Sequence, residues 1–214
     1  MKLLHILIFL FIISTVIYFI CNTKKPTNFI SLQKYPEMDI LVQNHDIILS
    51  ELNYVLKNSL WTNYDNLHKK NIFQESTNEE IQLKLQNSIS KISTNTSTPS
   101  WKIYGLLLNK EEIENNCSIT KQLLQSIPYV INAGFSCLEA GKITDYHSDN
   151  NLNYYRYQLP LIVPDGDAKF RLVNEIIEYV PNEPFIFDDS KLHQAWNLTN
   201  GIRIVLIVDI LKMK

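Results

Sequence analysis

The sequence is poor in cysteine and arginine and has no excess of positive charge. Three cysteines in 214 residues are too few for a scaffold built on disulfides. Twenty Lys and Arg against 22 Asp and Glu give a formal charge of −2. This balance argues against a nucleic-acid partner, because neutralising phosphates requires clustered basic side chains. Only three of the basic residues are arginines, so the position of each one is informative.

The rest of the composition is that of a folded globular chain. Hydrophobic residues make up 45% of the sequence and charged residues 20%, which excludes an intrinsically disordered protein. The length is enough for one domain with a sizeable core. We therefore expect a single folded domain.

Residues 3–21 form a long apolar run without a charged side chain. A helix of this length spans about 28 Å, enough for a thin bilayer. A cleaved signal peptide is the alternative, but the end of the run lacks the small-residue pattern of a cleavage site. We therefore expect residues 1–25 to hold one uncleaved transmembrane helix, the signal-anchor of a single-pass membrane protein.

The side of the membrane that the domain faces stays open, because few basic residues flank the run. Glycosylation sequons begin at Asn95, Asn116 and Asn197 and would be used only in a secretory lumen. In an oxidising lumen Cys117 and Cys137 could also pair. These features favour a lumenal (type II) glycoprotein.

Patterning divides the chain into the anchor (1–25), a stalk with a helical extension (26–100) and a β-rich domain (101–214). Apolar residues recur at helical spacing over 36–60. Thr77 and Glu80 form a capping pattern that opens a second helical stretch, which ends at Ile92. A low-complexity loop over 93–100 precedes the β-rich domain.

The β-rich domain contains many short apolar runs. We predict a strand over 101–108 and a short helix over 118–126. Five runs rich in β-branched and aromatic residues follow, at 129–138, 153–164, 168–180, 183–189 and 202–211. Short strands without long helices between them indicate an antiparallel sandwich or barrel. We expect a mainly β (α+β) fold, a double-stranded β-helix (jelly roll) with flanking helices.

Two histidines and an aspartate are the candidate metal ligands. His147 and Asp149 form a His-x-Asp pair whose side chains share one face at the two-residue period of a strand. His193 follows 46 residues later. Two imidazoles and one carboxylate on one face are typical of non-haem Fe(II) oxygenases. The pair alone is a weak signal, because His147 is equally well explained as a loop histidine.

The arginine positions strengthen this interpretation. Arg156 lies nine residues after His147, and Arg203 lies ten residues after His193. Arg203 stands in the alternating run 202–211, where its guanidinium is expected to be buried or to line a pocket. A buried arginine requires a carboxylate partner. That partner is either a protein Asp or Glu, or the carboxylate of a dicarboxylate cosubstrate.

Four motifs resemble the aspartyl/asparaginyl β-hydroxylase family. They are FSCLEAGKITDYH, RYQLPLIVP, FIFDDSKLHQAWN and RIVLIVDI, and the resemblance extends from Trp101 to Ile210. The block FDDS-x-x-H-x-x-W, from Phe187 to Trp196, is the most specific part. The resemblance implies a dioxygenase that uses Fe(II), O2 and 2-oxoglutarate on a double-stranded β-helix.

The resemblance also implies roles for individual residues. His147 and His193 match the two iron-binding histidines of the family. Asp149 stands where animal aspartyl hydroxylases lack a carboxylate ligand, whereas bacterial relatives that act on lipid A acyl chains or free amino acids keep it. The expected metal ligands are therefore complete, and the substrate class stays open.

The expected cosubstrate residues come from four separate runs. Ser136, Arg156 and Arg203 match family residues that hold 2-oxoglutarate, and Trp101 falls where a tryptophan lines the same pocket. Gln158 stands where many members have a histidine, and its amide can still donate a hydrogen bond.

The leading hypothesis is a hydroxylase acting on a peptidyl Asp or Asn, with lipid acyl chains or free amino acids as alternative substrates. A membrane-anchored binding module that has lost catalysis is the competing hypothesis. Zinc hydrolysis does not explain the two arginines beside the histidines. We interpret Asp188 and Asp189 as turn or capping residues and Trp196 as a core residue.

Overall fold

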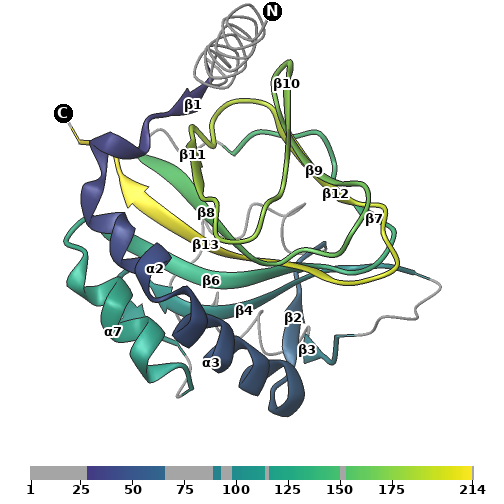
Figure 1. Cartoon of the computed structure of the whole chain (residues 1–214), viewed down its shortest axis with the longest axis horizontal. Coiled ribbons are helices and arrows are strands. Elements are labelled where there is room, and N and C mark those ends of the chain that lie inside the picture. The colour runs from purple at the N-terminus through teal and green to yellow at the C-terminus, as the bar shows by residue number, and fades with distance from the viewer. Residues whose placement is uncertain (1–27, 66–88, 93–97, 114–115, 150–152, 214) are drawn as a thin grey trace, which may run out of the picture.

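The computed structural model describes residues 28–65, 89–92, 98–113, 116–149 and 153–213 (Figure 1). The predicted membrane anchor (1–25), the sequon at Asn95 and most of the predicted helix over 77–92 lie outside these residues. Within the described ranges, no helix is long and apolar enough to cross a membrane.

The larger of two antiparallel sheets has nine strands. In their order of pairing these are β1 (Phe29–Ile30), β11 (Phe185–Phe187), β8 (Tyr154–Ile162), β13 (Arg203–Leu211), β6 (Val130–Leu138), β4 (Trp101–Leu108), β2 (Trp61–Asn63) and β3 (Ile89–Ser90), with β5 (Glu111–Glu112) beside β4. The smaller sheet lies across from one face of this sheet (Figure 1).

The smaller sheet has four strands in the order β10 (Glu175–Glu178), β9 (Ala168–Leu172), β12 (His193–Asn197) and β7 (Lys142–Ile143). From β6 onward the chain passes back and forth between the two sheets, and only the β9–β10 hairpin stays within one. The expectation of a mainly β sandwich is thereby confirmed.

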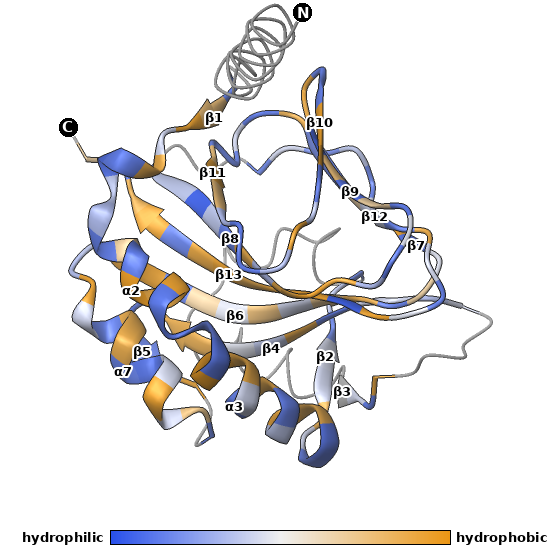
Figure 2. Ribbon diagram, in the orientation of Figure 1, coloured by the Kyte–Doolittle hydropathy of each residue, from blue (hydrophilic) through white to orange (hydrophobic). Residues whose placement is uncertain are grey.

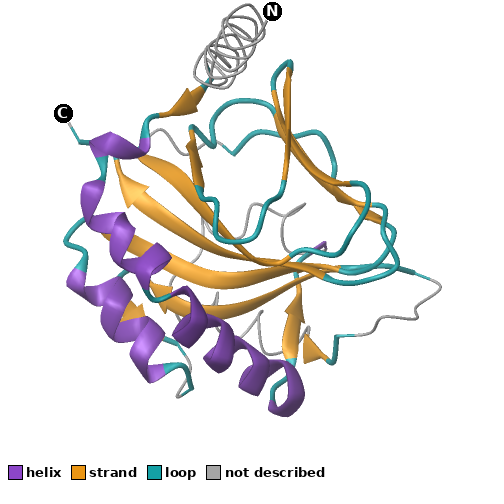
Figure 3. Cartoon of the chain, in the orientation of Figure 1, coloured by secondary structure: helices purple, strands orange, loops and turns teal. Residues whose placement is uncertain are grey.

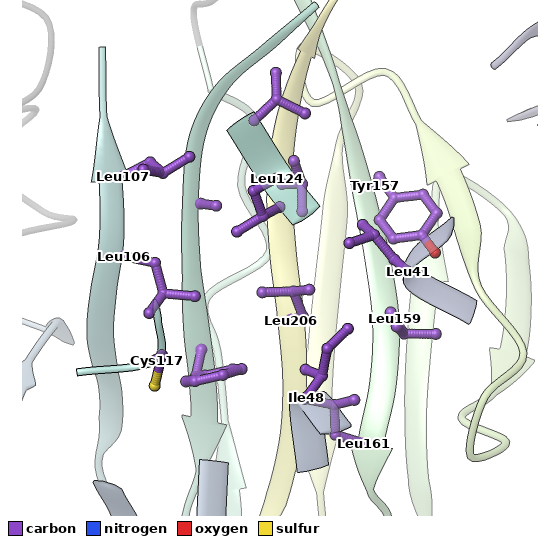
Figure 4. Close-up of a cluster of buried hydrophobic side chains, with 14 of the residues drawn as sticks. Leu41, Ile48, Leu106, Leu107, Cys117, Leu124, Tyr157, Leu159, Leu161 and Leu206 are labelled. Carbon is purple, nitrogen blue, oxygen red and sulfur yellow. The ribbon is translucent and has the colours of Figure 1, made fainter. Parts of the chain in front are cut away.

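The helices of the described residues cover the outer face of the larger sheet (Figure 3). They are η1 (Leu32–Lys34), η2 (Pro36–Met38), α2 (Asp39–Gln43), α3 (His45–Asn58) and α7 (Ser118–Ser126). Their buried side chains, such as Leu41, Ile48 and Leu124, pack against strand residues including Leu159 and Leu206 (Figure 4). This layer is the main hydrophobic core.

The alternation of β13 separates the two faces of the larger sheet. Its even-numbered apolar residues, such as Leu206 and Val208, belong to the core beneath the helices. Its odd-numbered residues Val205 and Ile207 belong to a second cluster, between the sheets. Figure 2 shows how apolar this strand is along its length. Because side chains alternate along a strand, Arg203 also faces the smaller sheet.

Several sequence predictions need correction. The helix expected over 36–60 is interrupted at Asn44, whose side-chain amide donates to the Ile40 carbonyl (2.8 Å). Ile89 and Ser90, expected at the end of a helix, form β3. The run 168–180 is a hairpin of two strands, with Val173 at φ 55° in the turn. The short helix over 118–126 is confirmed.

No disulfide joins Cys117 to Cys137, and both thiols are buried. The possible lumenal disulfide is therefore absent from the fold. Cys137 lies on β6 with its side chain in the core beneath the helices.

Candidate functional site

A pocket lies between the two sheets. Seven of the eight residues predicted from the sequence line it, and only Asp149 does not. Thr144, Phe170, Phe187, Ala195 and Ile207 complete the wall. Residues far apart in the sequence thus form one cavity.

Strand alternation explains how the larger sheet contributes its part. Ser136 on β6, Arg156 and Gln158 on β8 and Arg203 on β13 all lie on the face opposite the helices. Trp101 begins β4, and its indole Nε1 donates a hydrogen bond to Ser136 Oγ (2.9 Å).

The two histidines lie side by side at the rim of the smaller sheet. The His147 amide donates to the His193 carbonyl (3.0 Å), and the His193 amide donates to the His147 carbonyl (2.7 Å). Their ring centroids are 4.3 Å apart. This backbone pairing brings together two imidazoles that are distant in the sequence.

Each ring has one nitrogen at a backbone carbonyl. Nδ1 of His147 lies 2.7 Å from the Asp145 carbonyl, and Nδ1 of His193 lies 2.8 Å from the Lys191 carbonyl. A neutral imidazole that donates from Nδ1 offers its Nε2 lone pair to a metal. Burial, reinforced by the neighbouring His147, lowers the pKa of His193 to about 3 and keeps this ring neutral.

The carboxylate that lies against His193 is Asp189. Asp189 is 3% exposed, and its Oδ1 lies 3.4 Å from His193 Nε2. Burial raises the pKa of Asp189, although Arg156 acts in the opposite direction. Asp189 lies in the turn after β11, as predicted from the sequence. Its burial depends on long-range packing that no local pattern reveals.

Arg156 is surrounded by protein carboxylates. Its guanidinium lies 2.9 Å from Asp189, 2.9 Å from Asp209 and 3.4 Å from Asp149. Burial alone would lower the pKa of Arg156, but the three carboxylates raise it. The sequence left open whether a buried arginine pairs with a protein carboxylate or with a ligand. Arg156 pairs with protein aspartates.

Among the described residues, no three His, Cys, Asp or Glu side chains converge closely enough to make a complete metal site. The two histidines meet as predicted, while Asp149 and Asp189 both lie against Arg156. An attractive guanidinium competes with any cation for those two carboxylates.

Arg203 presents the opposite case. It is 2% exposed, and within the described part of the chain no carboxylate forms an ion pair with it. Its Nε has no hydrogen-bond acceptor. The guanidinium stacks on the Tyr179 ring, 4.7 Å from the centroid. A buried cation without an anion is costly, so this geometry fits an anionic ligand in the pocket.

Comparison with known proteins is consistent with this site. A family model described as aspartyl/asparaginyl beta-hydroxylase matches residues 43–213. An ornithine lipid ester-linked acyl 2-hydroxylase of Rhizobium tropici is 32% identical over 130 residues, which cover 60% of this chain and 46% of that relative. The chain thus spans less than half the length of this relative.

Solved structures are more distant. An oxidoreductase of the 2OG-Fe(II) oxygenase family from Burkholderia pseudomallei has a TM-score of 0.43 at 8% identity, covering 52% of this chain and 68% of its own. A cupin domain of a transcriptional regulator from Enterobacter cloacae has a TM-score of 0.38 at 10% identity, covering 53% and 98%. Both TM-scores are low.

Proposed function

We propose that this chain, which belongs to the aspartyl/asparaginyl β-hydroxylase family, is an oxygenase that hydroxylates a C–H bond with Fe(II), O2 and 2-oxoglutarate. We also assign the sandwich to the double-stranded β-helix type. The chain from β6 to β13 passes back and forth between the two antiparallel sheets, which supports this assignment.

The observation that carries the proposal is the unmatched charge of Arg203. A buried guanidinium beside a pocket, with no carboxylate partner among the described residues, suits the distal carboxylate of a dicarboxylate. Ser136 and Gln158 line the same pocket and can add hydrogen bonds. Arg156 is already matched by aspartates, so we assign it to holding those aspartates in place.

His147 and His193 would hold the iron through their Nε2 atoms, because each Nδ1 lies at a backbone carbonyl. The third ligand would be Asp149, as the His-x-Asp pattern suggests, or Asp189, which lies against His193. Bound iron would supply the activation of O2, which hydroxylates the substrate C–H bond while 2-oxoglutarate is oxidised to succinate and carbon dioxide. Phe170 and Phe187 line the pocket beside the histidines and exclude water.

For the substrate we propose a lipid acyl chain ahead of a peptidyl Asp or Asn. A peptidyl Asp needs a cation for its own carboxylate, yet Arg203 is assigned to the cosubstrate and Arg156 is matched by protein aspartates. The remaining wall includes Phe170, Phe187 and Ile207, which suit an alkyl chain. The relative named as an acyl 2-hydroxylase supports this choice.

We further propose that residues 1–25 anchor the enzyme in a membrane, with the domain on the lumenal side. The uncharged run of residues 3–21 supports the anchor. Such an anchor would keep the pocket near acyl substrates. Labelling of an added cysteine by a membrane-impermeant reagent in intact and opened vesicles tests the orientation.

Turnover tests the proposed reaction. The full-length protein with Fe(II), 2-oxoglutarate and a lipid extract should release succinate and form a lipid heavier by one oxygen atom. His147→Ala and His193→Ala should abolish both, whereas His45→Ala, in α3 beneath the larger sheet, should retain them. Absence of succinate with every extract, together with absence of iron binding, would contradict the proposal.

Iron affinity identifies the third ligand. Asp149→Asn and Asp189→Asn each remove one carboxylate charge and keep its shape. The variant of the ligating residue should lose iron affinity by about 10- to 100-fold or more, as measured by competition with a chelating dye. Equal, unchanged affinities would reject both residues as ligands.

A further inference from the structure

Tyr179 is a buried residue that does not line the pocket but touches two residues that do. It follows β10 and is 4% exposed. Its hydroxyl donates a hydrogen bond to Gln158 Oε1 (3.1 Å). The Arg203 guanidinium lies over its ring in a cation–π contact, 4.7 Å from the ring centroid. One side chain thus contacts the cation and the amide that face the cosubstrate.

The Tyr179 ring is itself firmly placed. It packs at 5.9 Å from the Phe185 ring and 6.4 Å from the Phe170 ring. Its backbone amide donates to the Ala168 carbonyl (3.3 Å). Tyr179, which follows β10 of the smaller sheet, therefore contacts Arg203 on β13 and Gln158 on β8. Both of these strands belong to the larger sheet (Figure 1).

The contact with Gln158 has a chemical consequence. An amide has a donor end and an acceptor end, and an anion is stabilised only by the donor end. When the Gln158 NH2 group points at a carboxylate, its Oε1 points away into a buried setting, since Gln158 is 5% exposed. An unmatched buried carbonyl oxygen is costly. The Tyr179 hydroxyl supplies the hydrogen bond that this oxygen then needs.

The contact with Arg203 acts on the same ligand. Within the described residues Arg203 has no protein anion and its Nε has no acceptor, while its guanidinium lies over the face of the Tyr179 ring. A cation held over an aromatic face in a desolvated site is favourably placed. A guanidinium that is already oriented can donate two hydrogen bonds to a carboxylate without losing further side-chain freedom on binding.

We propose that Tyr179 is the positioning residue of the cosubstrate-carboxylate site, orienting Arg203 through its ring and the Gln158 amide through its hydroxyl. The inference rests on the proposed function, because it takes 2-oxoglutarate as the anion. The segment after β10 thereby contributes to the affinity for 2-oxoglutarate.

Binding of 2-oxoglutarate to the Mn(II)-loaded full-length protein, measured by calorimetry without turnover, tests the inference. Tyr179→Phe removes the hydroxyl alone and should weaken binding about fivefold. Tyr179→Leu also removes the ring and should weaken it about thirtyfold or more. The control is Tyr129→Phe, which removes a hydroxyl that donates to Glu37 (2.8 Å) away from the pocket. It should leave 2-oxoglutarate affinity unchanged.

A double variant separates positioning from general stability. If the hydroxyl acts through the amide, Tyr179→Phe should have no further effect on 2-oxoglutarate affinity in a Gln158→Met background. Additive losses, or wild-type affinity in Tyr179→Phe, would overturn the inference while leaving the proposed function intact. A wild-type protein that binds Mn(II) but no 2-oxoglutarate would instead overturn the proposed function.

Discussion

Arg156 and Arg203 occupy the same face of the larger sheet but differ in their electrostatic surroundings. Arg156 meets three aspartates, whereas Arg203 meets an aromatic ring and no carboxylate of the described chain. A structural arginine is matched within the fold, while a ligand-binding arginine stays unmatched until its ligand arrives. At the residue scale, this contrast separates an arginine that pairs with protein aspartates from the arginine that we propose binds the cosubstrate.

Arg203→Met tests this contrast through stability as well as binding. Methionine keeps the length of the side chain and removes an uncompensated buried charge. We expect the free energy of unfolding of the ligand-free protein to rise by about 1 kcal/mol, and 2-oxoglutarate affinity to fall by at least about 100-fold. Urea unfolding and calorimetry measure the two effects. A less stable variant would mean that Arg203 has a protein partner after all.

The buried thiol of Cys137 makes stability depend on alkaline pH. Burial raises the pKa of Cys137 to about 12 from 9.0, against the lowering effect of Arg203. The unfolded thiol ionises above pH 9, whereas the folded thiol keeps its proton, so its contribution to stability falls as pH rises from 9 towards 12.

Relative to Cys137→Ala, the wild-type protein should therefore lose about 1 kcal/mol of stability between pH 9 and pH 10. Denaturant unfolding of both proteins at pH 8, 9 and 10 measures the difference, and the other titrating groups cancel in the comparison. A stability difference that stays constant over this range would show that the thiol is accessible to water.

At the scale of elements, the approach of β4 to β6 determines whether Trp101 reaches Ser136. Gly105 and Gly134 lie opposite each other where these strands pair. A Cβ on Gly134 would lie 2.9 Å from the Tyr104 carbonyl oxygen and 3.4 Å from the Gly105 Cα. Because both obstacles are backbone atoms, the strands would have to separate.

Gly134→Ala should lower the free energy of unfolding by about 2 kcal/mol through this overpacking. Gly105→Ala is the matched control, because its Cβ would meet only the flexible end of the Ile113 side chain (2.8 Å). Gly105→Ala should lower the free energy of unfolding by clearly less than Gly134→Ala does, in the same thermal or urea unfolding experiment. Equal losses would indicate that side-chain crowding, rather than the spacing of the strands, limits this site.

At the scale of the whole molecule, the sequence predicted many of the strands and the residues that line the pocket. Alternating apolar runs predicted the strands that became β4, β6, β8, β11 and β13. These strands depend on short-range periodicity, which a sequence displays directly. The resemblance to the aspartyl/asparaginyl β-hydroxylase family predicted that His147 and His193 would meet, and their backbone pairing does bring them together.

What the sequence could not show depends on contacts between distant segments. The strand β12 was missed because its buried positions include the polar residues His193 and Asn197. The carboxylates around Arg156, and the Tyr179 ring beneath Arg203, come from other strands and loops. Whether an inward arginine is matched by the protein or by a ligand becomes visible only after the two sheets are assembled.

The central claim is that one pocket binds a metal and a dicarboxylate together, and anaerobic equilibrium dialysis of labelled 2-oxoglutarate tests it most directly. With Fe(II) present, the full-length protein should bind one equivalent of 2-oxoglutarate. Arg203→Met should bind iron but lose 2-oxoglutarate, and a variant with both His147→Ala and His193→Ala should lose iron. Binding of 2-oxoglutarate that is independent of iron and unchanged in Arg203→Met would contradict the claim.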